Sequence, residues 1–330
     1  MNIDELHAHI ALVRQLSKPG GPLSINAPTS TARIKEFARG SGKVRADRQA
    51  LRSEIRQRAL ERATSNRRAI ILSGPPGAGK SSVAKLQLVE KKKQGHHYAH
   101  LDSDAFKIAL LQEALDTGTY ESHIKPVEIK ALETLGHHFF PLELASLVHT
   151  ESSRILTAAI DKAVQSGLDI MIEGVGANEK AARARMVQLE AAGYSVELLD
   201  IECSRDVSEE AIFTRWQGER EAALSLPPPR THLGGRWVPS PALDPIFPVI
   251  GGPSAPESVT NKVADDFPNV MAYQLWRRMS ATQDHQLEVD KIRPARGAPL
   301  INRQDFTYPR YASHPPRAVF RMRGRGEHER

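Results

Sequence analysis

One short segment narrows the choice of folds for these 330 residues more than any other. Residues 74–81 read Gly-Pro-Pro-Gly-Ala-Gly-Lys-Ser and match the pattern G-x-x-x-x-G-K-[ST] in full. The apolar run 69–72 before them is typical of a buried parallel strand, and a helical pattern follows at 80–92. A glycine loop in this context points backbone N–H groups and a helix N-terminus at one spot, so it predicts a phosphate-binding loop.

The residues of this loop have predicted roles in binding a nucleoside triphosphate, for which ATP with Mg²⁺ is the expected form. Lys80 should reach the β- and γ-phosphates, and Ser81 should place its hydroxyl on Mg²⁺. The predicted cofactor-binding residues are Gly74, Pro75, Pro76, Gly77, Ala78, Gly79, Lys80, Ser81 and Ser82. No guanine-binding motif is in place, and the chain length suits a small-molecule kinase.

Strand-like and helix-like segments alternate after residue 69. The expected strands are 69–72, 97–102, 168–174 and 195–202, and the expected helices between and after them are 80–92, 104–115, 141–166, 178–192 and 207–223. Such alternation predicts an α/β fold with a doubly wound, mostly parallel sheet flanked by helices. Residues 227–256 hold nine of the 22 prolines, which predicts a long surface excursion near the active side of the sheet.

Charge and pattern divide the chain into three parts. We expect a helical N-terminal extension (1–64), the α/β domain (65–280) and a basic C-terminal tail (281–330). Residues 1–66 and 291–330 carry net charges of +6 and +7, whereas the whole chain carries +6, so the middle is acidic. The basic ends are either solvated or able to bind nucleic acid, anionic lipid or an acidic partner.

The composition also bears on the cellular compartment. No apolar run approaches the roughly 18 residues that a membrane span needs, and the N-terminus lacks a secretory h-region. Cys203 is the single cysteine, so no internal disulfide can form. We expect a cytoplasmic protein that does not bind membranes.

Carboxylates follow two of the expected strands. A base that accepts the proton of the acceptor hydroxyl is expected at the end of the second strand, where Asp102 and Asp104 are equal candidates by spacing. Asp104 also stands where the following helix could begin, so it could instead be the N-cap of that helix. Glu173 ends the third strand, where it could bind an acceptor hydroxyl or a water on Mg²⁺.

Phosphoryl transfer also needs cations that neutralise the γ-phosphate oxygens. Four arginines are candidates, two on the expected helix 207–223 and two in the proline-rich excursion, and spacing alone cannot choose among them. They are Arg215, Arg220, Arg230 and Arg236. An arginine on a closing loop would also exclude water from the site.

Taken together, these segments resemble the zeta toxin family, whose members are kinases of toxin–antitoxin systems that phosphorylate UDP-N-acetylglucosamine. The resemblance covers about residues 65–280. It is carried by the segments GPPGAGKSS (74–82), LDSDAFK (101–107), IEGVG (172–176), TRW (214–216) and GGRWVP (234–239).

The resemblance implies roles for particular residues. It identifies Asp104 rather than Asp102 as the catalytic base, and Arg215 and Arg236 as the arginines that contact phosphate. Glu173 corresponds to the strand-end glutamate of the family. Lys80 and Ser81 keep the roles of the phosphate-binding loop. Family members are usually restrained by a small helical antitoxin that blocks the ATP site.

The acceptor half of the site departs from the family. Thr157 stands where the best-known members carry a substrate-binding Glu, and Glu173-Gly174-Val175-Gly176-Ala177 stands where they read E-G-T-G-R. A threonine and an arginine of the acceptor pocket are therefore missing, and Asn178 is the expected partial substitute.

We expect in-line transfer of the γ-phosphoryl group to a hydroxyl of UDP-N-acetylglucosamine or a related nucleotide. One alternative acceptor class is another nucleotide, NAD or a nucleic-acid 5′-hydroxyl, which the basic ends would favour. A second alternative is a nucleotide-dependent interaction module without catalysis. Residues 1–64 could restrain the kinase in cis, in the place of a separate antitoxin, or serve as a structural or docking appendage.

Overall fold

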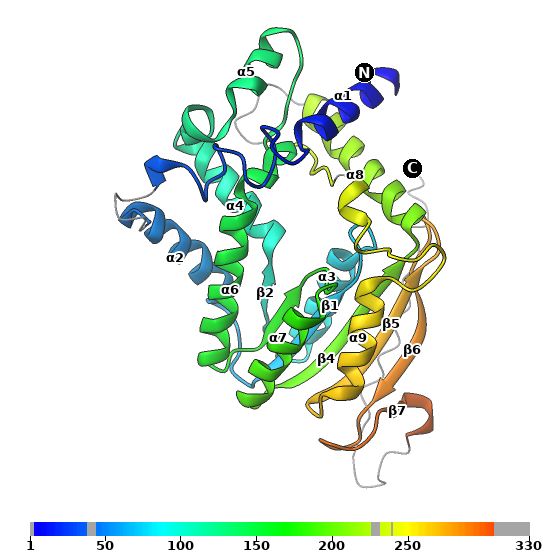
Figure 1. Ribbon diagram of the computed structural model, residues 1–330. Helices are drawn as coiled ribbons and strands as arrows, with labels where there is room; N and C mark the ends of the chain where they lie inside the picture. Colours follow the sequence, from blue (N-terminus) through cyan, green and yellow to red (C-terminus); the bar gives the residue numbers. More distant parts are fainter. Residues whose placement is uncertain (1–2, 38–43, 226–231, 239, 307–330) are drawn as a thin grey trace, which may run out of the picture.

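The computed structural model describes residues 3–37, 44–225, 232–238 and 240–306. In these residues a seven-stranded sheet has the order β2-β3-β1-β4-β5-β6-β7. The first five strands in this order run parallel, and β6 and β7 are antiparallel. The predicted doubly wound, mostly parallel sheet flanked by helices is confirmed (Figure 1).

The central strands are short and apolar because helices cover both faces. All four residues of β3 are buried, and β1 buries four of its six. The strands are β1 (Arg68–Ser73), β2 (Ala99–Asp102), β3 (Ile170–Glu173), β4 (Ser195–Cys203), β5 (Val270–Arg278), β6 (Gln286–Ile292) and β7 (Ile301–Asn302). The four strands predicted from the sequence are β1 to β4.

The predicted helices are also present. The described helices are α1 (Ile3–Leu16), α2 (Ala46–Leu60), α3 (Lys80–Lys93), α4 (Ser103–Asp116), α5 (Val127–Thr134), α6 (His149–Gln165), α7 (Glu179–Ala191), α8 (Arg205–Ser225) and α9 (Ala255–Asp266), of which α5 and α9 are not among the helices expected from the sequence. The stretch predicted as one helix over 141–166 is a 3₁₀ segment, η3 (Pro141–Val148), followed by α6. Among the described helices, none is long and apolar enough to cross a membrane.

The strands past residue 266 are the main difference from the expectation. We predicted a basic tail from residue 281, but Gln286–Ile292 pairs with β5 and Ile301–Asn302 pairs with β6. These strands lie toward the edge of the sheet and are half-exposed, so they can be polar and carry no apolar run that the sequence would reveal. The described sheet therefore extends well past residue 281.

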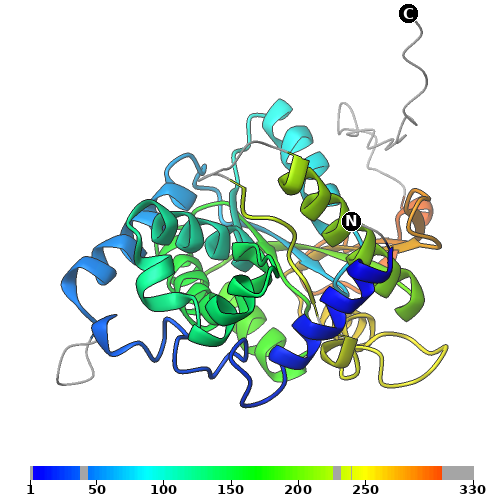
Figure 2. The ribbon, with the colours of Figure 1, turned by 90° about the horizontal axis from the view of Figure 1, so that it is seen from above.

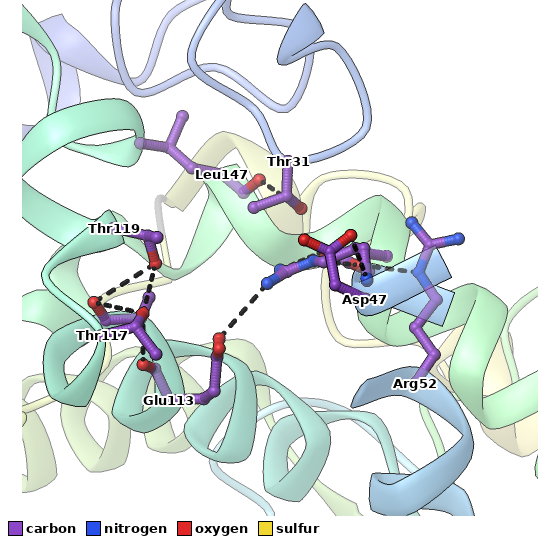
Figure 3. A network of polar contacts seen from close by, with 10 residues as sticks. Thr31, Asp47, Arg52, Glu113, Thr117, Thr119 and Leu147 are labelled. Carbon is purple, nitrogen blue, oxygen red and sulfur yellow. Dashed lines mark hydrogen bonds and ion pairs between the residues drawn. The ribbon is translucent and has the colours of Figure 1, made fainter. Parts of the chain in front are cut away.

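The N-terminal extension packs on the helices that precede β3. Arg48 and Arg52 of α2 both bind Glu151, in the first turn of α6, with Nη2 of Arg48 at 2.6 Å and Nε of Arg52 at 2.7 Å. Arg48 also reaches Glu113 of α4 (Figure 3). The side chain of Glu151 is fully buried, so this network ties α2 firmly to the α/β domain.

Candidate functional site

The phosphate-binding loop joins β1 to α3 at the carboxyl edge of the parallel sheet, where such folds bind ligands. Gly74 has φ of 135°, and a Cβ there would lie 1.9 Å from the carbonyl oxygen of Ile201. Only glycine therefore fits at the start of the loop. Ser208 of α8 donates a 2.6 Å hydrogen bond to the carbonyl of Pro76, which holds the loop from the other side.

Lys80 begins α3 and points back along this loop. Its Nζ donates to the carbonyl oxygens of Gly74 and Pro75 at 2.7 and 2.8 Å. Burial lowers the pKa of Lys80, and the negative charges of Glu173 and Glu202 oppose that shift. The ammonium group thus lies inside the loop, with acidic groups near it.

Ser81 and Glu173 come together from α3 and the end of β3. The Ser81 hydroxyl donates a 2.6 Å hydrogen bond to Oε1 of Glu173, and His100 of β2 lies 3.1 Å from Oε2. Burial tends to raise the pKa of Glu173, but these hydrogen bonds and Lys80 lower it below its usual value. A hydroxyl and an ionised carboxylate are oxygen ligands of the kind that Mg²⁺ takes, so the residues fit this ion.

The two aspartates after β2 have different surroundings. Asp102 is the N-cap of α4, because its Oδ1 accepts from the backbone N–H of Asp104 at 2.9 Å. Burial and the negative charges of Asp104 and Glu173 raise the pKa of Asp102. The capping role that the sequence suggested for Asp104 therefore belongs to Asp102, and the Asp104 carboxylate is free of it.

Asp104 is held by two cations. Nη1 and Nη2 of Arg236 lie 2.9 Å from Oδ1 and Oδ2 in a bidentate pair, and Nζ of Lys107 lies 2.8 Å from Oδ1. Burial tends to raise the pKa of Asp104, but Arg236 and Lys107 outweigh it and lower the pKa. The structure therefore joins the end of β2 to a segment more than 130 residues later.

The other candidate arginines differ in their burial and in their contacts. Arg215 is exposed on α8, close enough for the charges of Arg236 and Asp104 to affect its pKa. Arg220 is buried one helical turn further on and binds Glu143 with Nη1 at 3.0 Å from both carboxylate oxygens. Arg230 lies outside the described residues. Of the described candidates, Arg215 and Arg236 thus lie near the predicted base.

The acceptor residues expected from the resemblance lie on α6 and α7. Thr157 is exposed and lines a cavity of about 490 Å³ along one side of α6. Asn178 is the N-cap of α7 and accepts from the N–H of Ala181 at 3.0 Å. The cavity residues are His149, Thr150, Ser153, Arg154, Thr157, Ala158 and Asp161. Burial lowers the pKa of His149, and the charges of Lys107, Asp104 and Arg236 also act on it, so this cavity begins near the predicted base.

Lys107 and His100 are among the residues that contact the predicted site and that sequence reasoning missed. Lys107 lies three residues after Asp104, and this helical spacing could have identified it as a partner. His100 lies two residues before Asp102 and so on the same side of β2, but its contact with Glu173 depends on the pairing of β2 with β3. Strand order is not visible in the sequence.

A family model described as Zeta toxin matches residues 38–124 and 137–254, which is more than half of the chain. No curated protein matches this chain at a significant level.

Two solved structures are similar to this chain. The complex AvrRxo1-ORF1:-ORF2 with ATP has 16% identity and a TM-score of 0.51, covering 80% of this chain and 72% of that chain. A structure from the PezAT chromosomal toxin–antitoxin system of the human pathogen Streptococcus pneumoniae also has 16% identity, with a TM-score of 0.41 and coverage of 74% and 79%. At such low identity, the likeness extends to the fold alone.

Proposed function

This chain belongs to the zeta toxin family, and on that premise we propose that it transfers the γ-phosphoryl group of ATP to a hydroxyl of UDP-N-acetylglucosamine or a related nucleotide. The observation that carries the proposal is the bidentate pair between Asp104 and Arg236, with Arg215 beside it. A carboxylate and two arginines beside a phosphate-binding loop are the groups that in-line phosphoryl transfer needs.

In this mechanism Lys80 leaves the carbonyls of its loop and binds the β- and γ-phosphates. Ser81 and Glu173 are the residues that would hold Mg²⁺, and the ion, when bound, would neutralise phosphate charge. Arg236 moves from Asp104 toward the γ-phosphate, and Arg215 supports it. Asp104 then accepts the proton of the acceptor hydroxyl, and its lowered pKa keeps it ionised and ready.

We place the acceptor in the cavity along α6, which starts near Asp104 at His149 and continues past Thr157. Its volume of about 490 Å³ is in the range of small-molecule sites. Arg154 lines this cavity, and within the described chain it forms no hydrogen bond or ion pair with another side chain. A cation at this position suits the phosphate of a nucleotide acceptor and would supply the charge that Ala177 does not.

The deciding experiment measures transfer from labelled ATP to UDP-N-acetylglucosamine. We expect Lys80→Ala to abolish it, and Asp104→Asn to reduce it by at least about a hundredfold while ATP binding stays nearly unchanged. Full activity in Asp104→Asn would show that the assigned base is wrong. No transfer by a wild-type protein that still binds ATP would exclude this acceptor, and NAD, other nucleotides and RNA 5′-ends would be tested next.

Two further proposals concern partners. AvrRxo1-ORF1 was solved with ORF2, which agrees with a protein partner that restrains this kinase. The extension 1–64 could provide this restraint in cis, in which case its removal would raise activity.

Steep salt dependence of RNA binding would favour a nucleic-acid acceptor. An ATP-binding protein with no transfer to any acceptor would instead be an interaction module.

A further inference from the structure

Helix α1 lies outside the residues that the family model matches, yet its inner face is buried as deeply as the core. Leu6, Ile10 and Val13 expose only 2%, 6% and 1% of their surface. Figures 1 and 2 show α1 alongside α8, the helix that carries Arg215. An added helix that buries this much apolar surface is part of the folded kinase rather than a loose appendage.

A buried carboxylate fixes α1 in place. The side chain of Glu143, in η3, is fully buried, and His9 of α1 donates to its Oε1 at 2.9 Å. Trp216 and Arg220 of α8 also donate to Glu143, each at 3.0 Å, and the N–H of Phe140 donates at 2.8 Å. One carboxylate thus joins α1, η3 and α8, and each of its oxygens accepts at least two hydrogen bonds.

The segment that carries Arg236 lies against the same three elements. We call residues 232–238 the arginine segment; Figure 2 shows it passing beside α8. The N–H of Leu142 donates to the carbonyl of Leu233 at 2.8 Å. The backbone passes so close that a Cβ on Gly234 would lie 2.3 Å from Phe140, and one on Gly235 would lie 2.5 Å from the carbonyl oxygen of Trp216.

Helix α1 covers this segment at Trp237, the residue after Arg236. The guanidinium of Arg14 lies 5.4 Å from the centre of a Trp237 ring, in the range of a cation–π contact. Trp216 packs edge-on against Trp237 at 5.6 Å, and His9 stacks on Trp216 at 6.0 Å. A continuous chain of contacts therefore runs from His9 through Trp216 to the neighbour of Arg236.

We propose that α1 is a strap that positions the arginine segment, and that His9 is the positioning residue that locks the strap to Glu143. The proposal rests on the proposed function, because it is the transfer step that needs Arg236 placed at the γ-phosphate, next to Asp104. Positioning is valuable here because a small displacement of a catalytic arginine costs much of its rate enhancement. The strap thus supports activity and does not block the ATP site.

Hydrogen exchange tests the strap without requiring catalysis. In His9→Ala we expect the amides of residues 232–238 to exchange about tenfold faster, because a hydrogen bond to a buried charge is lost. Exchange in the phosphate-binding loop, residues 74–81, should not change, which also shows that the variant is folded. His9→Gln should restore slow exchange, because the glutamine Nε2 reaches about as far as the imidazole Nε2 and can donate to Glu143.

Kinetics provide the second readout. We expect His9→Ala to lower kcat for phosphoryl transfer about tenfold, with the KM for ATP unchanged, and His9→Gln to recover most of it. His7→Ala is the matched control, since His7 is exposed on the same helix and contacts α8 through Phe213 (ring centroids 6.0 Å) rather than through Glu143, so both readouts should change much less than in His9→Ala. Arg14→Ala should give a smaller effect in the same direction, because it removes only the contact with Trp237.

The outcomes separate the two proposals. If wild-type protein transfers no phosphate to any acceptor, the proposed function fails, while the exchange of residues 232–238 still decides whether the strap exists. A higher kcat in His9→Ala would overturn positioning and support a restraint in cis. Unchanged exchange at residues 232–238, or equal effects of His7→Ala and His9→Ala, would also overturn it.

Discussion

Glu143 and the pair Asp200–Glu202 are all fully buried acids, but their surroundings are opposite. Glu143 accepts hydrogen bonds from His9, Trp216, Arg220 and a backbone N–H. In the described residues, the four carboxylate oxygens of Asp200 and Glu202 accept no hydrogen bond of good geometry, although Asp200 and Ser254 lie close enough to Glu202 to affect its pKa. Burial raises the pKa of both acids of the pair. The negative charge of Asp200 raises the pKa of Glu202 further.

This contrast shows two ways in which a buried acid is tolerated. A carboxylate with enough donors stays in the interior as a charge and fixes the segments that carry the donors. A carboxylate without donors is tolerated because it takes up a proton, and it makes stability depend on pH. Glu143 joins elements far apart in the sequence, whereas Asp200 and Glu202 lie on one strand beside β1.

The largest effect should follow from removing the partnered acid. Glu143→Ala leaves the buried Arg220 without its counter-ion, so we expect a loss of about 3–5 kcal/mol in the free energy of unfolding. Urea denaturation measures this loss. Glu54→Ala is the control, because Glu54 forms an exposed pair with Arg58 on α2 and should change stability by less than about 1 kcal/mol. A loss in Glu143→Ala no greater than in the control would erase the contrast.

Features that depend on local sequence patterns could be predicted, whereas features that depend on long-range contacts could not. The loop at 74–81, strands β1 to β4 and the helices around them have local patterns, and the sequence predicted them. The meeting of Asp104 with Arg236, or of His9 with Glu143, depends on segments more than 130 residues apart and on packing. The edge strands β6 and β7 were missed because half-exposed strands need no apolar run.

An intermediate effect is expected for Glu151, which sharpens the comparison as a second partnered acid. Burial tends to raise its pKa, but the hydrogen bonds and charges of Arg48 and Arg52 lower it below the usual value. Its contribution to stability is therefore present above the unfolded pKa of about 4.5 and is lost as pH falls through the folded pKa. Glu151→Gln should lose about 2–3 kcal/mol at pH 7.

The dependence of stability on pH below pH 5 tests whether Glu151 is ionised in the folded protein. Since the variant has no carboxylate to protonate, its stability should fall less steeply than that of the wild type below pH 5. Urea midpoints between pH 3 and pH 7 provide the measurement, and Glu54→Ala is again the matched control. Parallel curves for Glu151→Gln and the wild type would mean that the two arginines do not hold Glu151 as an ion.

The smallest effect, with the opposite sign in pH, should come from the unpartnered pair. Burial and the negative charge of Asp200 raise the pKa of Glu202 well above its ordinary value, so the folded protein holds a proton that the unfolded chain releases near pH 4.5. The stability that this proton brings is complete below the unfolded pKa. It is lost gradually as pH rises toward the folded pKa.

Glu202→Gln removes this proton uptake while keeping the shape of the side chain. Between pH 6 and pH 9 we therefore expect the variant to lose less stability than the wild type. The free energy of unfolding of the variant should thus rise relative to that of the wild type as pH rises. Urea midpoints across this range measure the slopes, and Glu197→Gln is the control, because Glu197 lies on the same strand and is paired with Lys91 at 2.7 Å. Equal slopes in Glu202→Gln and the wild type would mean that Glu202 is ionised in the folded protein. The pair would then have donors, as Glu143 does, and the two regions would not differ in kind.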